Sequence, residues 1–380
     1  MKKLLMLSTG SYKSTLTIRL RDLARHMGKD FDVTVLAPSA DKYNGFKPDY
    51  SLKPEGHRLI QPWQLATHSP ILNLIPYLFT SLFHILKSRA DVVYMYKPTP
   101  ITILGLIPRL WGRQVILDMD DLGSEVMKLE GQSGFSVALV AFSERVAMRF
   151  ASRVVVTSTL LETEVKARYP RKPVLLLPNG VEPNDYAETP EKPLRNAVYY
   201  FGAINRLDLI EDLLRSLPSV IRDVPDAHVT IAGGGSALEA AQKLVRELGV
   251  EKSVTFTGWL TNMHAVQQHT QFGDIGICYQ PDGRTNRAAS NMKVFQYMAM
   301  HTVPVVSDVG DLHSYVRDGE AGVIVEPGNS EALATAVSAL LRDTKRRTRL
   351  TREASELATK THSWQQRAHA LVAFMNGATS

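Results

Sequence analysis

Short apolar runs alternate along the chain with segments in which apolar positions recur at three- and four-residue spacing. The first such unit predicts a strand at residues 2–8, a helix at 16–27 and a strand at 31–37. Further short runs rich in β-branched residues, each followed by a helical pattern, continue to residue 341. This alternation predicts an α/β fold with doubly wound parallel sheets, in which helices cover both faces.

A charged stretch with three prolines at residues 183–196 interrupts this pattern and has the composition of a linker. The chain has 380 residues, which is long enough for two separate cores. We therefore expect two Rossmann-like domains, at residues 1–185 and 186–360, whose sheets face each other across a cleft. Residues 361–380 hold one more helical pattern.

A short polar stretch with Ser290 and Asn291 precedes a pattern of helical spacing that starts at Met292. We predict a loop that opens into a helix at this point. The first N–H groups of a helix, reinforced by its dipole, bind phosphate, and Lys293 adds a positive charge one turn inside. The sequence thus predicts a diphosphate site here. The alternative is an ordinary capped helix of a β-α-β unit.

Three carboxylates, Asp118, Asp120 and Asp121, follow a predicted strand at residues 115–117. At the carboxyl end of a strand they are placed to act as a general base, to hold sugar hydroxyls or to hold a divalent metal. Alternatively, Asp121 caps the helix that follows. Gly10 lies in a loop at the end of the first predicted strand, where open α/β sheets bind ligands.

Residues 59–86 contain no Asp, Glu, Lys or Arg, and residues 71–86 are mostly large and apolar. Pro76 and the polar residues before this stretch oppose a membrane-spanning helix. Two interpretations remain open. The segment is a helix buried on the sheet, or its exposed apolar face enters a bilayer with Lys87 and Arg89 at the headgroups.

The net charge of +6 suits anionic ligands or an anionic membrane surface. Nucleic acid is not expected as a partner, because no block of Lys and Arg with interleaved aromatics occurs. The single cysteine, Cys278, excludes a disulfide within the chain and fits a reducing cytoplasm. The apolar part of residues 1–8 is too short for a signal peptide and is interpreted as the first strand.

Several short motifs occur in a fixed order between residues 154 and 345. They are residues 178–181 (Pro-Asn-Gly-Val), 200–202 (Tyr-Phe-Gly), 256–258 (Phe-Thr-Gly), 293–299 (Lys-Val-Phe-Gln-Tyr-Met-Ala), 304–310 (Pro-Val-Val-Ser-Asp-Val-Gly) and 316–322 (Val-Arg-Asp-Gly-Glu-Ala-Gly). In this order the chain resembles the family 4-like GT-B nucleotide-sugar glycosyltransferases, also called glycosyl transferases group 1. These enzymes move a sugar from a nucleotide-sugar to an acceptor.

The resemblance implies that the donor binds the second domain and that its sugar is transferred with retention. It also implies that the C-terminal helix packs back on the first domain. The residues expected to bind the donor are Gly10, Gly202, Arg206, Gly258, Trp259, Ser290, Asn291, Met292, Lys293 and Gln296. Among them, Arg206 would neutralise the phosphates and the base would lie near Trp259.

Two glutamates that the family carries with seven residues between them correspond here to Ala288 and Gln296, and the usual histidine of the first domain corresponds to Asp120. The glutamine side chain still hydrogen-bonds a ribose hydroxyl, whereas alanine does not. We expect Asp120 or Asp121 to orient the acceptor or take its proton. Arg206 and Lys293 would stabilise the leaving group, which is sufficient without a metal or another cofactor.

The basic charge and the uncharged segment together predict a lipid-linked acceptor at the inner face of a membrane, as in cell-surface polysaccharide synthesis. The expected protein is therefore a hexosyl-type glycosyltransferase of the cytoplasm with peripheral membrane contact. The missing glutamates favour one alternative, a catalytically weak or inactive partner subunit that keeps the nucleotide site. A second alternative is a different enzyme on the same fold, such as a nucleotide-sugar epimerase or a phosphorylase.

Overall fold

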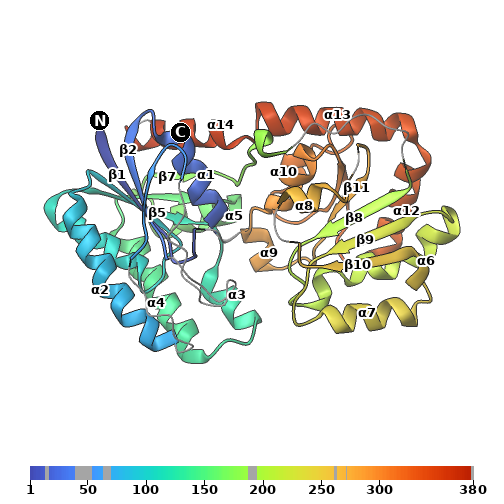
Figure 1. Ribbon diagram of the computed structural model, residues 1–380, viewed down its shortest axis with the longest axis horizontal. Coiled ribbons are helices and arrows are strands. Elements are labelled where there is room, and N and C mark those ends of the chain that lie inside the picture. The colour runs from blue at the N-terminus through green and yellow to red at the C-terminus, as the bar shows by residue number, and fades with distance from the viewer. Residues whose placement is uncertain are drawn as a thin grey trace. The chain divides into compact units, whose positions relative to one another are not determined.

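The computed structural model describes residues 1–12, 17–38, 54–62, 70–186, 195–260, 263–270 and 272–377 (Figure 1). It divides into two compact units. Unit 1 comprises Met1–Asn179 with Trp364–Ser380, and unit 2 comprises Gly180–Ser363. Each unit is a parallel sheet with helices on both faces, which confirms the predicted α/β class with two Rossmann-like sheets.

The sheet of unit 1 has seven strands in the order β3-β2-β1-β4-β5-β6-β7, and all recorded pairs are parallel. Its strands are β1 (Lys2–Leu7), β2 (Phe31–Leu36), β3 (Arg58–Ile60), β4 (Val92–Tyr96), β5 (Gln114–Met119), β6 (Arg153–Val156) and β7 (Val174–Leu176). β1 lies between β2 and β4, so the strand order reverses at β1, and ligands of such sheets bind at the carboxyl ends near this point.

The helices of unit 1 are α1 (Ile18–Met27), α2 (Pro70–Ser88), the 3₁₀ helix η3 (Thr102–Trp111), α3 (Gly123–Leu129), α4 (Gly134–Phe150), α5 (Thr159–Arg168) and α14 (Trp364–Met375). The C-terminal helix α14 belongs to this unit and packs against α1. Within the described residues, the structure has no helix long and apolar enough to span a bilayer.

The sheet of unit 2 has six strands in the order β10-β9-β8-β11-β12-β13. They are β8 (Ala197–Phe201), β9 (His228–Ala232), β10 (Val254–Gly258), β11 (Ile275–Cys278), β12 (Val303–Ser307) and β13 (Val323–Val325). The helices are α6 (Glu211–Asp223), α7 (Leu238–Glu247), α8 (Met263–Gln267), α9 (Arg284–Ala288), α10 (Met292–Ala299), α11 (Leu312–Val316), α12 (Ser330–Arg342) and α13 (Thr344–Lys360), with 3₁₀ turns η4 (Pro183–Asp185), η5 (Leu207–Leu209) and η6 (Glu251–Ser253).

Successive residues of β8 point to opposite faces of this sheet and build two hydrophobic cores. Val198 and Tyr200 pack with the buried faces of α6, α7 and α12, whereas Tyr199 and Phe201 pack with α10, α11 and α13. Burying one such side chain stabilises the fold by about 1.5–3 kcal/mol. Both faces are therefore covered, and only the loops at the strand ends remain for binding.

The boundary between the units lies between Asn179 and Gly180, a few residues before the boundary at 185/186 expected from composition. The amide of Val181 donates to the carbonyl of His362 at 2.9 Å, and Val181 also forms a parallel bridge with Ser363. These bonds attach the segment after Asn179 to unit 2. The chain returns to unit 1 at Trp364 rather than at residue 361. Residues 187–194 of the expected linker lie outside the described residues.

Candidate active site

Three neighbouring strands of unit 2 end in glycines whose backbones lie against each other. The amide of Gly202, after β8, donates to the carbonyl of Ala232, and the amide of Gly233 donates to the carbonyl of Gly258. Gly233 has φ +152°, and a Cβ there would lie 1.9 Å from the carbonyl oxygen of Gly202. No other residue fits this position, so the carboxyl edge is a surface of closely packed main chain.

Trp259 follows this glycine surface directly. Its side chain is 64 % exposed, and its indole nitrogen would lie 2.7 Å from a Cβ built on Gly234. The ring therefore lies close to the glycine loop after β9. An exposed indole beside bare main chain is suited to stacking with a flat aromatic ligand.

Helix α10 begins at Met292, as the sequence predicts, with Asn291 as its N-cap. The side-chain oxygen of Asn291 accepts from the amide of Lys293 at 3.3 Å, and its amide group donates to Gln280. The cap satisfies the amide of Lys293, whereas the first amide of the helix, at Met292, has no acceptor within the helix. Ser290 is buried, and its hydroxyl lies 3.3 Å from that of Tyr315.

The side chain of Lys293 runs from α10 to the end of β8. Its Nζ lies 3.3 Å from the hydroxyl of Tyr200 and 4.3 Å from the centre of that ring. A Cβ on Gly202 would lie 2.9 Å from the same nitrogen. Burial opposes the charge, but Tyr200 and Cys278 favour it, and the pKa of Lys293 is raised. A cation thus lies beside the glycine surface and the start of α10.

Arg206 also follows β8, but its guanidinium is paired with the carboxylate of Asp208, with Nε 3.0 Å from Oδ1. Both side chains are partly exposed. Of the two predicted cations, Arg206 is therefore partly neutralised by its neighbour.

The two residues at the positions of the family glutamates are both buried. Gln296 is buried on α10, and Ala288 is fully buried at the end of α9.

The carboxylates of unit 1 are at the carboxyl end of β5, as predicted, but they differ in surroundings. Asp118 is fully buried and accepts from the guanidinium of Arg19 at 2.7 and 3.1 Å and from the hydroxyl of Tyr94. Burial opposes the charge of Arg19, but Asp118 outweighs it and the pKa of Arg19 is raised above its ordinary value. Both oxygens of Asp118 accept from Arg19 or Tyr94, so Asp120 and Asp121 remain the candidates among the three carboxylates.

Asp120 is less enclosed and accepts from the hydroxyl of Tyr96 at 2.8 Å and from the side-chain amide of Asn179 at 3.1 Å. Burial would raise the pKa of Asp120, but the charges of Lys97 and Arg19 and these hydrogen bonds outweigh it, and the pKa is lowered. A carboxylate with a lowered pKa is a weak base at neutral pH. This arrangement therefore favours holding hydroxyl groups over taking a proton.

Asp121 pairs with Lys97, whose Nζ lies 2.6 Å from its carboxylate. The N-cap of α3 is Leu122, without a side-chain cap, so the alternative in which Asp121 caps that helix is wrong. Lys97, Tyr96 and Asn179 were not among the predicted site residues. Their signal in the sequence is position alone: Tyr96 ends strand β4, Lys97 follows it directly, and Asn179 comes three residues after β7.

Gly10 also lies in unit 1, in the loop after β1, where its amide donates to the hydroxyl of Ser8 at 3.1 Å. The predicted residues thus form two groups. One consists of Gly202, Gly258, Trp259 and the residues around Lys293 at the edge of unit 2, and the other of Gly10, Asp120 and Asp121 at the edge of unit 1.

Two family models match the chain in succession. Residues 15–180 match the glycosyl transferase 4-like domain, and residues 195–343 match the glycosyl transferases group 1. The chain belongs to the GT-B glycosyltransferases. It is an enzyme that depends on a nucleotide-sugar.

The glycosyltransferase is 26 % identical over 308 residues to the GDP-mannose-dependent alpha-(1-6)-phosphatidylinositol monomannoside mannosyltransferase of Mycolicibacterium smegmatis, covering 76 % of each chain. In structure it is similar to sucrose-phosphate synthase of Thermosynechococcus elongatus, with a TM-score of 0.74 at 18 % identity, covering 99 % and 98 % of the two chains. A TM-score of 0.72 at 15 % identity, covering 100 % of each chain, relates it to Anabaena Alr3699/HepE, solved with UDP and glucose.

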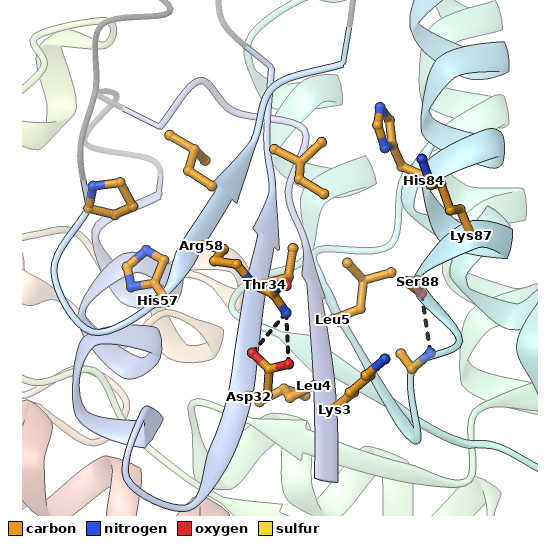
Figure 2. A pocket seen from close by; sticks show the side chains of 14 residues that line it. Lys3, Leu4, Leu5, Asp32, Thr34, His57, Arg58, His84, Lys87 and Ser88 are labelled. Carbon is orange, nitrogen blue, oxygen red and sulfur yellow. Dashed lines mark hydrogen bonds and ion pairs between the residues drawn. The ribbon is translucent and has the colours of Figure 1, made fainter. Parts of the chain in front are cut away.

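The glycosyltransferase also has a pocket of about 560 Å³ elsewhere in unit 1, between β1–β3 and the end of α2 (Figure 2). Lys3, Arg58 and Lys87 contribute positive charge to its lining, and Arg58 donates to Asp32 across neighbouring strands. Of β1 and β2, the last two residues do not line it, whereas β3 lines it along its whole length. Because open parallel sheets bind substrates at the carboxyl ends, this pocket is not the candidate active site.

Proposed function

We propose that the enzyme binds a nucleotide-diphosphate sugar at the carboxyl edge of unit 2, with the diphosphate at the start of α10. The observation that carries this proposal is the Nζ of Lys293 beside Gly202, where three glycine loops meet the start of a helix. Bare main chain admits a phosphate closely, and a helix start and a cation favour its charge. Trp259 would stack on the base, and Gln296 would contact the ribose.

In this proposal Arg206 and Lys293 stabilise the negative charge that develops on the leaving diphosphate. Electrostatic stabilisation of this kind is commonly the largest single term in catalysis, so no metal or further cofactor is required. Asp120 and Asp121 hold the acceptor hydroxyls, in keeping with the lowered pKa of Asp120. Transfer with retention at the anomeric carbon is proposed from family membership. Turnover that survives EDTA would support the metal-free part.

We propose a lipid-linked saccharide at the cytoplasmic face of a membrane as the acceptor, as in cell-surface polysaccharide synthesis. Two observations support it. The Mycolicibacterium relative is named for a phosphatidylinositol-linked mannoside. The helix predicted at the uncharged segment, α2, leaves Phe79 and Phe83 exposed while Tyr77 and Ile85 on its other face are buried.

The donor site is tested by thermal shift of the purified protein with UDP, GDP, ADP, TDP and CMP, because only a nucleotide that binds stabilises the fold. Transfer from the sugar of the stabilising nucleotide is then measured for Arg206→Ala and Lys293→Ala. The exposed Lys252 of unit 2 provides the control Lys252→Ala. We expect large losses of rate for the first two only.

Rates of Arg206→Ala and Lys293→Ala within about threefold of the wild type, less than about 1 kcal/mol of barrier, would contradict the assignment. Nucleotide binding without turnover on any donor would instead favour the alternative of an inactive partner subunit. The absence of both family glutamates is the observation that supports this alternative.

A further inference from the structure

Large apolar side chains that are exposed gather in one part of unit 1. In the described ranges of the chain, all of them except Met1 and Trp259 lie on α2, η3, α3 and α4. They are Phe79, Phe83, Leu86, Leu110, Trp111, Leu129, Phe135, Leu139, Phe142 and Phe150. An exposed apolar group of this size on one part of a protein marks an interaction site.

Helix α4 carries large apolar residues on its exposed side and small residues on its buried side. Phe135, Leu139 and Phe142 recur at helical spacing on its exposed side, and Phe135 is 79 % exposed. The residues that α4 buries are the small ones, Ser143 and Ala147. A helix that only packs on a sheet places its large apolar residues inward. The outward face of α4 is therefore built for a contact beyond unit 1.

The same feature extends over two neighbouring elements. On α2, Phe79, Phe83 and Leu86 are exposed, and both α2 and α4 pack against η3. The end of η3 carries Leu110 and Trp111, which are 83 % and 62 % exposed. We call these eight residues, namely Phe79, Phe83, Leu86, Leu110, Trp111, Phe135, Leu139 and Phe142, the α2–η3–α4 surface.

Positive charge accompanies the α2–η3–α4 surface. The exposed basic residues of the same elements and the segment after α2 are Lys87, Arg89, Arg109, Arg145 and Arg149. The sequences of α2 and η3 contain no Asp or Glu, and that of α4 contains only Glu144, which accepts from Ser124. The Nζ of Lys87 lies 5.5 Å from the centre of the Phe83 ring, so a positive charge lies next to an exposed apolar ring.

Aromatic and aliphatic side chains next to Lys and Arg suit the boundary between acyl chains and anionic headgroups. A second copy of this chain fits less well, because it would bring basic residues against basic residues. We propose that the α2–η3–α4 surface docks the enzyme peripherally on a bilayer that contains anionic lipids. This proposal rests on the lipid-linked acceptor and names the surface that meets its membrane.

The test is flotation of the full-length protein with vesicles of phosphatidylcholine alone or with about 30 % phosphatidylglycerol, a composition that supplies anionic charge. The apolar variants are Phe135→Ser with Phe142→Ser, and Phe79→Ser with Phe83→Ser. The charge variant is Arg145→Gln with Arg149→Gln, and its matched control is Lys252→Gln with Lys345→Gln, two exposed lysines of unit 2.

We expect the wild type and the control to bind the anionic vesicles. Each apolar variant should lower the partition coefficient by about tenfold or more, and the charge variant should weaken binding most at low salt. All variants should keep the thermal shift that the nucleotide produces, which shows that they are folded.

The proposal is overturned if the wild type binds neither vesicle, or if the apolar variants bind as tightly as the wild type. It is also overturned if these variants change only the oligomeric state in size-exclusion chromatography, since the surface would then join two copies. Failure of the acceptor proposal has a different readout. Transfer to lipid-linked saccharides in detergent would be absent for the wild type, whatever the vesicles show.

Discussion

The buried ion pair of Arg19 and Asp118 predicts a large loss of stability when a single carboxylate oxygen is replaced by an amide nitrogen. Their side chains are 1 % and 0 % exposed, and the Nε of Arg19 lies 2.7 Å from the carboxylate. At an effective dielectric constant of about 20, two charges at this distance attract by about 6 kcal/mol, offset by the desolvation of both ions. Asp118→Asn keeps the shape and removes one charge.

Because the guanidinium of Arg19 would remain buried without its counter-ion, we expect Asp118→Asn to destabilise unit 1 by about 3–5 kcal/mol. The free energy of opening is measured by hydrogen exchange of peptides from β4 and β5, with peptides from β12 as an internal control in unit 2. The double variant Arg19→Met with Asp118→Leu removes both charges and should cost much less than the single change.

The reasoning is refuted if Asp118→Asn lowers the opening free energy of β4 and β5 by less than about 1 kcal/mol, the range of an exposed pair. Equal losses in β5 and β12 would also contradict it, because the pair would then not act within unit 1.

Three further predictions concern single positions. Gly202→Ala places a side chain where φ is +140° and should cost about 1–3 kcal/mol. Gly233→Ala, at φ +152°, should cost more and lower the urea midpoint further, because its Cβ meets a backbone oxygen rather than the movable end of Lys293. Burial lowers the pKa of His57 to about 4, so the stability of unit 1, followed by urea unfolding, should fall as the pH drops from about 6.5 towards that value, and His57→Asn should remove this loss. Trp259→Ala should weaken nucleotide binding by up to about tenfold in calorimetry without changing the melting temperature of the free protein, since the ring is 64 % exposed.

The regular alternation of strands and helices could be predicted because short runs such as residues 275–278 and 303–306 are apolar throughout, as strands buried on both faces require. Helix α4 has no counterpart in the sequence prediction. Its large apolar residues face outward and its buried residues are small, so the usual periodic signal of a packed helix is reversed.

The start of α10 and the position of Lys293 could also be read from the sequence, because a cap and a helix start are local features. The surroundings of the carboxylates could not. Arg19 lies 99 residues before Asp118, and Asn179 lies 59 residues after Asp120. Such partners meet only when the strands are placed in their sheet order, which the local pattern does not specify.

The pair of Arg206 and Asp208 predicts that removing a charge, that of Asp208, strengthens nucleotide binding instead of weakening it. Both side chains are partly exposed, so the pair contributes only about 0–1 kcal/mol to stability. If Arg206 binds the donor diphosphate, Asp208 competes with the phosphates for the guanidinium and repels them. Asp208→Asn should therefore tighten nucleoside diphosphate binding in titration calorimetry at low salt, and the gain should vanish in the background of Arg206→Ala. Weaker binding by Asp208→Asn would mean that the carboxylate positions Arg206 instead, and an unchanged affinity would remove Arg206 from the phosphate site.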